Sequence, residues 1–485
     1  MNSSSHESVD VLIIGAGLSG IGGACQLRRN SPKRSFAIFE SRAVSGGTWD
    51  LFRYPGIRSD SDMYTLSYGF KPWQHKSAIA HGSSILDYIR EAAKEYDVER
   101  HIRYQHEVVT ADWSNEKKRW HVTATRGDTG ESITISCLFI LSCSGYYDYD
   151  KGYTPEFAGR DNFKGEVIHT QHWPEDLDYK DKRVVVIGSG ATAVTLIPEM
   201  SQETRSMTML QRSPTYIANV PERDAMAEML RKWLPVSLVF RLTRWKRVLF
   251  QRYIYQLSRR KPKQLRHFLL NKVREELGPD YDVAKHFTPS YNPWDQRLCA
   301  VPEGDMFKAI REGRADVVTD HIENFNSDGI RLQSGQQLDA DLIILATGLN
   351  LKFGGGVQYS VGGETIDFSQ HYVYRGMMFS DIPNLGFVVG YTNSSWTLKA
   401  DLTSNYMCRL LNRMQRTGYE SVTPRVKAGI VDTPLMDFEA GYVLRSREQF
   451  PKQGDRFPWR VYQDYIRDFF SLGYGSLKDD ELEFR

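Results

Sequence analysis

The feature that most constrains the fold is a short apolar run that leads directly into a glycine-rich turn. The run 11–14 is followed by Gly15-Ala-Gly17-Leu-Ser-Gly20, and a second apolar run, 36–39, ends at Glu40. In a βαβ unit the first glycine permits the tight turn, the second lets backbone approach a phosphate, and the third lets helix and strand pack closely. An acidic residue after the second strand hydrogen-bonds ribose hydroxyls. Gly15, Gly17, Gly20 and Glu40 are therefore predicted to bind a dinucleotide.

A second unit of the same kind begins near residue 183. The apolar run 183–187 leads into Gly188-Ser189-Gly190-Ala-Thr-Ala193, and a further apolar run ends just before Arg212 and Ser213. Arg212 thus takes the place that Glu40 has in the first unit. A guanidinium binds a 2′-phosphate through two parallel hydrogen bonds, whereas a carboxylate would repel it. The second unit is predicted to bind NADPH rather than NADH, with Ser213 adding a hydroxyl donor.

Two further apolar runs end in turns of small residues, 137–141 before Ser142-Cys-Ser-Gly145 and 341–345 before Ala346-Thr-Gly348. The chain resembles the flavoproteins with two dinucleotide-binding domains, in which such turns mark where it leaves and re-enters the FAD domain. The predicted fold class is α/β, with two Rossmann-like domains and a helical insertion. The predicted FAD-binding domain consists of residues 1–145 and 346–485, the second part of which includes a C-terminal segment. The predicted NADPH-binding domain consists of residues 146–220 and 281–345. Residues 221–280 form the predicted basic helical insertion.

The predicted insertion is strongly basic. Residues 221–280 hold 15 Lys or Arg against 6 Asp or Glu, whereas the formal charge of the whole chain is only +2. Apolar residues such as Leu238, Trp245 and Leu249 recur at spacings that predict amphipathic helices. Two interpretations stay open: a solvated helical cap over a substrate cleft, and peripheral contact of the apolar faces with anionic lipid.

Two longer motifs indicate a family. The run Phe163-Lys-Gly165-Glu-Val-Ile-His169-Thr-Gln-His-Trp173-Pro174 resembles the fingerprint F-x-G-x-x-x-H-x-x-x-W-[P/D] of type I Baeyer–Villiger monooxygenases. Residues 46–60, GGTWDLFRYPGIRSD, resemble the longer pattern [A/G]-G-x-W-x-x-x-x-[F/Y]-P-[G/M]-x-x-x-D of the same family. The resemblance extends over essentially the whole chain. It implies FAD and NADPH as cofactors and the insertion of one atom of O2 beside a ketone carbonyl.

The resemblance also implies roles for individual residues. Arg297 matches the catalytic arginine, whose fixed positive charge stabilises a developing oxyanion, and Asp60 would hold it in position. His169 is implied to hydrogen-bond in the linker between the domains and to couple their motion. The residues implied to contact FAD are Gly15, Gly17, Ser19, Gly20, Glu40, Gly47, Thr48, Trp49, Asp50, Leu51, Asp60 and Val108. The residues implied to contact NADP are Gly188, Ser189, Gly190, Ala191, Thr192, Ala193, Arg212 and Ser213. Gln296 departs from the lysine usual near the 2′-phosphate in better-known ketone oxidisers, which predicts that NADPH binding is weaker or depends more on Arg212.

The leading hypothesis is an enzyme that converts small hydrophobic ketones into esters or lactones and also oxidises sulfur in thioethers or thioamides. The alternative is a flavin monooxygenase that acts mainly as an S- or N-oxidase on xenobiotics; Trp173 argues against it, because that sister group usually ends the fingerprint in Tyr or Phe. A dithiol–disulfide reductase is excluded, because the five cysteines include neither C-x-x-C nor C-x-x-x-x-C. A non-enzymatic flavin-binding protein is disfavoured by the retention of Arg297, Asp60 and both nucleotide sites.

The remaining composition limits partners and compartment. The near-neutral charge argues against nucleic acid, and the scattered cysteines indicate neither a metal site nor disulfides. No run approaches the about 20 apolar residues that span a bilayer, and the N-terminus lacks the pattern of a signal peptide. A cytoplasmic protein, with or without peripheral membrane contact, is expected. Natural substrate and oligomeric state are not predicted.

Overall fold

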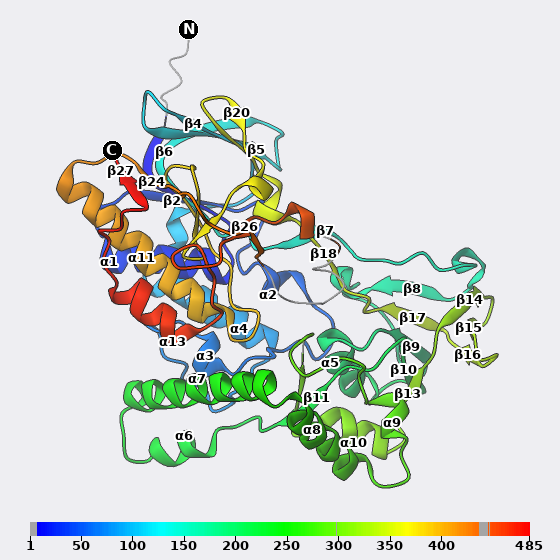
Figure 1. Ribbon diagram of the computed structural model, residues 1–485. Helices are drawn as coiled ribbons and strands as arrows, with labels where there is room; N and C mark the ends of the chain where they lie inside the picture. Colours follow the sequence, from blue (N-terminus) through cyan, green and yellow to red (C-terminus); the bar gives the residue numbers. More distant parts are fainter. Residues whose placement is uncertain (1–6, 297, 436–444, 446) are drawn as a thin grey trace.

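The computed structural model describes residues 7–296, 298–435, 445 and 447–485, so the predicted catalytic residue Arg297 lies outside the described residues. The chain forms a larger and a smaller lobe, with the helices of the predicted insertion along one side of both (Figure 1). Each lobe is built on its own β-sheet, and each sheet contains one of the two predicted strand–turn–helix units. The predicted α/β class with two Rossmann-like domains is confirmed.

The larger lobe is built on an 11-stranded sheet. At its centre β1 (Glu7–Ile14) lies parallel to β2 (Phe36–Phe39) and β6 (Ser132–Ser142), and β6 also pairs with β23 (Leu385–Phe387). Helices α1 (Leu18–Asn30) and α11 (Trp396–Thr417) pack against each other beside these strands. The other strands of this sheet are β3 (Ile102–Arg103), β4 (His106–Ser114), β5 (Arg119–Arg126), β19 (Gln358–Val361), β20 (Glu364–Thr365), β21 (Val373–Tyr374) and β22 (Met378–Phe379).

The smaller lobe contains a five-stranded, wholly parallel sheet. Its strand order is β13 (Ala315–Thr319), β10 (Ser206–Gln211), β9 (Arg183–Ile187), β17 (Leu342–Leu345) and β8 (Glu166–His169). Helices α5 (Ala191–Met200) and α10 (Asp305–Arg311) share its core with buried residues of β9 and β17 such as Val186 and Ile344. A small antiparallel sheet of β14 (Ile322–Asn326), β15 (Gly329–Leu332) and β16 (Gln337–Asp339) extends this lobe.

The chain crosses between the lobes twice at one place. It leaves the large sheet after β6 through β7 (Tyr147–Gly152) and returns after β17 through β18 (Leu349–Leu351). The two crossing strands pair antiparallel. The predicted boundaries at residues 145 and 346 fall next to these strands. The apolar run 137–141 lies within β6, and the run 341–345 lies in β17 from Leu342 onward, one in each sheet.

The predicted helices of the insertion are also present, as α6 (Ala225–Leu230), α7 (Val236–Arg260) and α8 (Pro262–Leu277). Helix α7 contacts α3 (Met63–Leu66) of the larger lobe, whereas α8 contacts α10 and β11 (Ile217–Val220) of the smaller lobe (Figure 1). Within the described residues, none of the helices has both the length and the apolar character needed to cross a bilayer.

The remaining short elements connect these layers. They are α2 (Thr48–Leu51), α4 (Gly82–Glu95), α9 (Val283–His286), α13 (Tyr465–Asp468), β12 (Cys299–Pro302), β24 (Val422–Pro424), β25 (Thr433–Pro434), β26 (Lys452–Gln453), β27 (Leu482–Phe484), the 3₁₀ helices η1 (Glu99–His101), η2 (Arg160–Asn162), η3 (Thr170–His172), η4 (Phe353–Gly356), η5 (Phe368–Gln370) and η6 (Arg447–Gln449), and the π-helical turn η7 (Phe469–Tyr474).

Candidate functional site

A cleft of about 430 Å³ runs from the first glycine turn, along the loop 46–61, to the start of α5. It therefore reaches from the nucleotide-binding unit of one lobe to that of the other. The predicted site residues that line it are Gly15, Gly17, Ser19, Glu40, Gly47, Thr48, Trp49, Asp60, Val108, Ala191 and Thr192. Those that lie outside its lining are Gly20, Asp50, Leu51, Gly188, Ser189, Gly190, Ala193, Arg212 and Ser213.

The floor of the cleft at the β1–α1 turn is bare backbone. Gly15 has φ +99°, and a Cβ there would lie 2.7 Å from the carbonyl oxygen of Cys143. A Cβ on Gly20 would lie 1.9 Å from the carbonyl oxygen of Gly15, so this glycine permits close packing inside the turn. A Cβ on Gly47 would lie only 3.0 Å from Cα of Gly17. Two glycine loops thus meet at the start of α1, where N–H groups favour an anion such as a pyrophosphate.

Glu40 stands beside this turn at the end of β2 and is 5% exposed. Its Oε2 accepts a hydrogen bond from the N–H of Ala16 (2.7 Å), and its Oε1 accepts one from the N–H of Arg42 (3.0 Å). Oε1 also accepts a hydrogen bond from the Ser41 hydroxyl (3.4 Å), whereas Oε2 keeps a second lone pair. The side chain is therefore fixed at the edge of the cleft with acceptor capacity left for ribose hydroxyls.

Asp50 has a different environment from the one that the resemblance implies. Its buried carboxylate pairs with Arg42 (2.6 Å) and Arg90 (2.9 Å), and neither Asp50 nor Leu51 lines the cleft. Arg42 also donates to the carbonyl oxygen of Gly47 (3.3 Å). In this structure the Asp50 side chain therefore supports the loop that carries Gly47, Thr48 and Trp49.

The second glycine turn has the same backbone geometry and is more open. Gly188 has φ +138°, and a Cβ there would lie 2.3 Å from the carbonyl oxygen of Ala346. The Ser189 hydroxyl donates to the carbonyl oxygen of Ser213 (3.1 Å), which ties the turn to the end of β10. Arg212 and Ser213 are exposed directly after β10. Exposed donors next to the start of α5 form an arrangement that can bind an anionic 2′-phosphate.

The loop 54–60 joins the two nucleotide units. Gly56 has φ +73°, and a Cβ there would lie 2.9 Å from the carbonyl oxygen of Thr195 in α5. Burial raises the pKa of Tyr54, so its phenol remains a proton donor at neutral pH. Asp60 is exposed in the lining of the cleft. Its predicted partner Arg297 lies outside the described residues, so their pairing stays a prediction.

The same loop carries an ion pair between the lobes that sequence reasoning missed. Arg58 of the larger lobe pairs with Asp305, the first residue of α10 in the smaller lobe, at 2.5 Å (Nη1 to Oδ2) and 3.3 Å (Nη2 to Oδ1). Two parallel bonds between a guanidinium and a carboxylate fix direction as well as distance. Arg58 also lines the cleft. The pair therefore sets how α10 is held against the cleft loop.

Aromatic residues that were given no role in the sequence analysis complete the walls. Trp396 donates from Nε1 to the Ser19 hydroxyl (2.8 Å), and its ring stacks on Tyr146. Tyr149 hydrogen-bonds with the Thr48 hydroxyl (3.1 Å). The available signals were indirect. Tyr146 and Tyr149 follow the small-residue turn at 142–145, and Trp396 falls in the stretch 390–401, which only its resemblance to the family marks.

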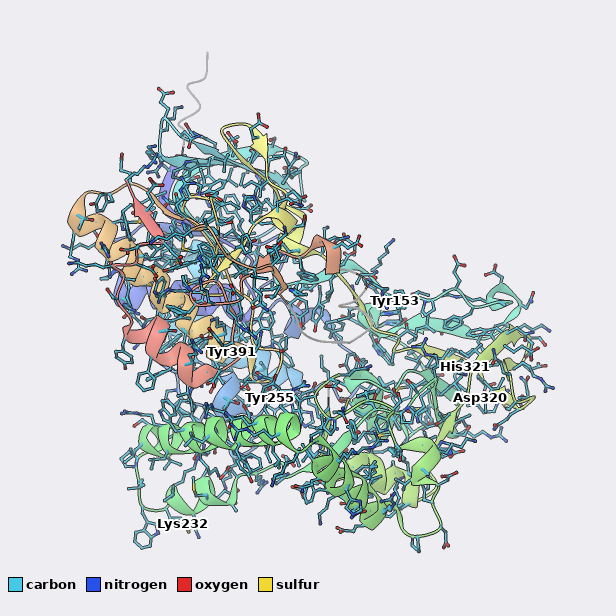
Figure 2. The ribbon with its side chains drawn as sticks, viewed as in Figure 1. Tyr153, Lys232, Tyr255, Asp320, His321 and Tyr391 are labelled. Carbon is cyan, nitrogen blue, oxygen red and sulfur yellow. The ribbon has the colours of Figure 1, made fainter. Side chains whose placement is uncertain are left out.

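Tyr391, labelled in Figure 2, belongs to the same stretch. It lines the cleft and contacts a buried charge pair. Its hydroxyl donates to Oδ2 of Asp468 (2.7 Å), which also accepts a hydrogen bond from Nζ of Lys399 (2.7 Å). Burial and the neighbouring carboxylate hold the pKa of Tyr391 well above its usual value. The phenol therefore stays protonated, and its ring is held in a fixed position in the cleft wall.

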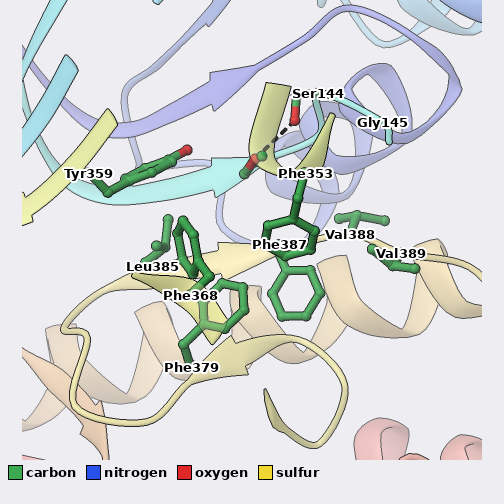
Figure 3. A pocket seen from close by; sticks show the side chains of 12 residues that line it. Ser144, Gly145, Phe353, Tyr359, Phe368, Phe379, Leu385, Phe387, Val388 and Val389 are labelled. Carbon is green, nitrogen blue, oxygen red and sulfur yellow. Dashed lines mark hydrogen bonds between the residues drawn. The ribbon is translucent and has the colours of Figure 1, made fainter. Parts of the chain in front are cut away.

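A smaller apolar cavity of about 20 Å³ adjoins the cleft at Ser144 and Gly145 (Figure 3). Phenylalanines 353, 368, 379 and 387 form much of its wall, and the Ser142 and Ser144 hydroxyls bond to each other at its edge (3.3 Å). Tyr359, whose pKa is raised by burial, is the titratable residue of its lining. Its walls resemble packed core, and we assign it no chemistry.

His169 lies at the crossing of the two linkers, at the end of β8. A Cβ on Gly152 would lie 1.9 Å from Cε1 of its ring, so β7 passes directly over the imidazole. Its Nδ1 accepts a hydrogen bond from the N–H of Gln171 (3.1 Å), and burial lowers its pKa. A neutral imidazole in the linker agrees with the predicted placement, and a part in domain movement stays a prediction.

Comparison with known families and curated proteins adds independent information. Residues 62–354 match a family model described as flavin-binding monooxygenase-like, and residues 13–78 match an NAD(P)-binding Rossmann-like domain. The chain is 51% identical to the FAD-containing monooxygenase EthA of Mycobacterium tuberculosis (strain H37Rv), over 99% of this chain and 98% of that protein. It is 48% identical to the probable FAD-binding monooxygenase AlmA of Acinetobacter baylyi, over 99% of this chain and 96% of that protein.

Solved structures give a likeness of fold. An open crystal structure of cyclohexanone monooxygenase superposes with a TM-score of 0.77 at 19% identity, covering 99% of this chain and 100% of that one. Oxidized steroid monooxygenase bound to NADP superposes with a TM-score of 0.75 at 22% identity, covering 98% and 99%. At these identities the superpositions concern architecture alone.

Proposed function

The chain belongs to the flavin-binding monooxygenase-like family, and from that premise we propose that it is an FAD- and NADPH-dependent Baeyer–Villiger monooxygenase. It would take a hydrophobic ketone, O2, NADPH and a proton, and release an ester or lactone, NADP⁺ and water. The observation that carries the proposal is one cleft that runs from the first glycine turn to Ala191 and Thr192 at the start of α5, the helix that follows the second glycine turn. A hydride donor in one unit and a flavin in the other would meet in this cleft together with the substrate.

The residues present fit FAD. Side chains at positions 17 and 47 would fill the backbone cradle between Gly17 and Gly47, so the two glycines leave room there for a pyrophosphate. The Glu40 carboxylate suits the ribose. Ser19, Thr48 and Trp49 line the next part of the cleft, and Val108 lies in its lining as well. Bound FAD supplies the redox chemistry and the activation of dioxygen, while these residues bind and orient it.

The residues of the second unit fit NADPH. Arg212 and Ser213 would bind the 2′-phosphate, and the open turn at Gly188, Ser189 and Gly190 would bind the pyrophosphate at the start of α5. Ala191 and Thr192 line the shared cleft, so the nicotinamide end would extend toward it. Bound NADPH supplies the hydride.

The chain's own contribution to oxygen insertion is electrostatic. Arg297 would bring a permanent positive charge to the cleft, where it stabilises the negative charge that develops on the carbonyl oxygen of the substrate. The Asp60 carboxylate, which is in the lining of the cleft, would orient that guanidinium. Tyr391 and Trp396 line the cleft and are both held by hydrogen bonds, so they would shape the wall around the ketone and shield it from water.

Comparing Arg297→Ala with Arg297→Lys in the FAD-loaded protein tests the proposal. We expect Arg297→Ala to oxidise NADPH but to form no ester from a ketone, and Arg297→Lys to recover part of the ester formation because a positive charge remains. Product analysis by mass spectrometry beside an NADPH oxidation assay separates the two steps. Unimpaired ester formation by Arg297→Ala would show that the role given to this residue is wrong.

Oxidation of thioethers and thioamides is proposed as a second activity of the same cleft. A sulfur lone pair attacks an electrophilic oxygen, so no oxyanion forms on the substrate and the requirement for Arg297 falls away. The Arg297→Ala protein should therefore keep sulfoxidation when ester formation is lost. If the wild-type protein oxidises sulfur or nitrogen but no ketone, the alternative of an S- or N-oxidase is correct.

A further inference from the structure

Helix α7 has apolar residues on two opposite faces. Val239, Phe240 and Val248 are buried on the inner face, toward the larger lobe. On the outer face, five apolar residues form one stripe. Their successive spacings are four, three, four and four positions, which keep side chains on the same side of a helix. The stripe, called here the outer stripe, consists of Leu238, Leu242, Trp245, Leu249 and Tyr253, which are 37 to 62% exposed. Trp245, the least exposed of them, also packs edge-on against Phe469 (ring centroids 5.1 Å apart) and so lies at the border of the stripe.

The outer stripe belongs to an unusual concentration of exposed apolar side chains. Of the 17 large hydrophobic residues that are exposed in the described part of the chain, 10 lie between residues 229 and 268. Trp233, just before α7, is 83% exposed. Exposed apolar side chains are ordinary when they are scattered, whereas a contiguous patch marks an interaction site. The surface therefore needs a partner.

The charge around the stripe limits what that partner can be. Residues 229–274 contain 14 Lys or Arg and no Asp or Glu. Carboxylates from elsewhere neutralise some of them: Asp224 pairs with Lys246 and Arg247, and Asp464 with Arg252. Other cations are exposed along the segment, namely Lys232, Arg241, Arg260, Lys261 and Lys263; Figure 2 shows Lys232 at the outer edge of the molecule.

We propose that the outer stripe of α7 docks on the surface of a bilayer that contains anionic phospholipid. Leucine and aromatic side chains on one helix face, bordered by Lys and Arg, are the composition with which a helix lies in the membrane interface. Long cationic side chains reach the headgroups while the apolar stripe enters the boundary with the acyl chains. A second copy of this chain fits less well, because symmetric pairing would bring two basic faces together.

The inner face of α7 connects this surface to the cleft. Arg244, 8% exposed, donates to the carbonyl oxygens of Tyr64 (2.9 Å) and Ser67 (2.8 Å) at α3. Gln251 donates to Asp62 (3.2 Å) and accepts from the hydroxyl of Ser394 (2.9 Å), a residue of the cleft lining. Helix α7 would thus lie between the bilayer and the cleft, which suits an apolar substrate dissolved in lipid.

Co-sedimentation of the full-length, FAD-loaded protein with vesicles tests the proposal. We expect binding to vesicles of phosphatidylcholine mixed with phosphatidylglycerol, weaker binding to phosphatidylcholine alone, and loss of the difference at high salt. The exposed-residue variant Leu242→Ser/Leu249→Ser should bind about 10- to 30-fold more weakly, from the apolar area withdrawn from the bilayer. Lys261→Glu/Lys263→Glu should lose the preference for anionic vesicles.

The matched control is Tyr419→Ser/Val431→Ser, which removes apolar side chains of similar exposure (40% and 61%) far from α7 in sequence and should bind as wild type. Equal binding of the Leu242→Ser/Leu249→Ser protein, or no binding of wild type to anionic vesicles, would overturn the proposal. The proposal would also be overturned if analytical ultracentrifugation showed that wild type is an oligomer and that Leu242→Ser/Leu249→Ser dissociates it. A second copy of the chain would then cover the stripe. NADPH oxidation with a water-soluble ketone tests the proposed function separately and should be unchanged in all these variants.

Discussion

Replacing Gly17 by alanine separates the binding of FAD from the stability of the protein. Gly17 has φ −83°, which alanine adopts without strain, and the new Cβ would lie 3.5 Å from Cα of Gly47, an ordinary contact. The fold should therefore tolerate the change. The methyl group would, however, stand in the cradle between the two glycine loops, where the pyrophosphate is expected to lie against the backbone.

The expected magnitude follows from the hydrogen bonds that a displaced phosphate would lose. A hydrogen bond to a charged group contributes about 1.5 to 3 kcal/mol, so losing two weakens FAD binding by about 3 to 6 kcal/mol, or roughly 10² to 10⁴-fold. The assay is FAD titration of the apoprotein by flavin fluorescence, together with thermal unfolding of the apoprotein.

Gly130→Ala is the matched control, because Gly130 has φ +72° and open space around its Cβ position in a surface turn. Alanine there should cost about 1 to 2 kcal/mol of stability through backbone strain and leave FAD affinity unchanged. Wild-type FAD affinity in Gly17→Ala would refute the assignment of the cradle. A Gly17→Ala protein that fails to fold would refute the steric reasoning.

Two further predictions concern NADPH and acid stability. Arg212→Ala should raise the KM for NADPH about 10- to 100-fold and leave the KM for NADH nearly unchanged, because the guanidinium would bind only the 2′-phosphate. Steady-state kinetics with each coenzyme measures both KM values. Equal increases in the two KM values would contradict the assignment of Arg212. Hydrogen bonds from Arg183 lower the pKa of Asp341 from 3.8 to about 2. This lowered pKa contributes stability that is fully present above pH 3.8 and is lost as the pH falls toward 2. In Asp341→Asn, stability should therefore depend less on pH between about 4 and 2, as measured by acid unfolding followed by circular dichroism. An unfolding curve identical to that of wild type would contradict this role of Asp341.

The parts of the fold that the sequence predicted are local ones. Each glycine turn lies between a strand and a helix that are adjacent in the chain, so the residues that define it are read from one short segment. The helices of the insertion were predicted for the same reason, because their apolar spacing is local. Which apolar face of α7 is buried depends on α3 and could not be read from that spacing.

The parts that could not be predicted join residues far apart in the sequence. Arg58 and Asp305 are separated by 247 positions, and Trp396 and Ser19 by 377. Asp50 was assigned to FAD from resemblance, but its position beside Arg42 and Arg90 depends on how α2 meets α4. Such pairs depend on the packing of separate elements, and residue types alone do not determine them.

The central claim, oxygen insertion into a ketone, is tested most directly by turnover under ¹⁸O₂ with NADPH and a panel of hydrophobic ketones. The account predicts an ester or lactone that carries one ¹⁸O atom, formed in proportion to the NADPH consumed. NADPH oxidation that yields only hydrogen peroxide across the panel, with no labelled ester or lactone, would contradict it.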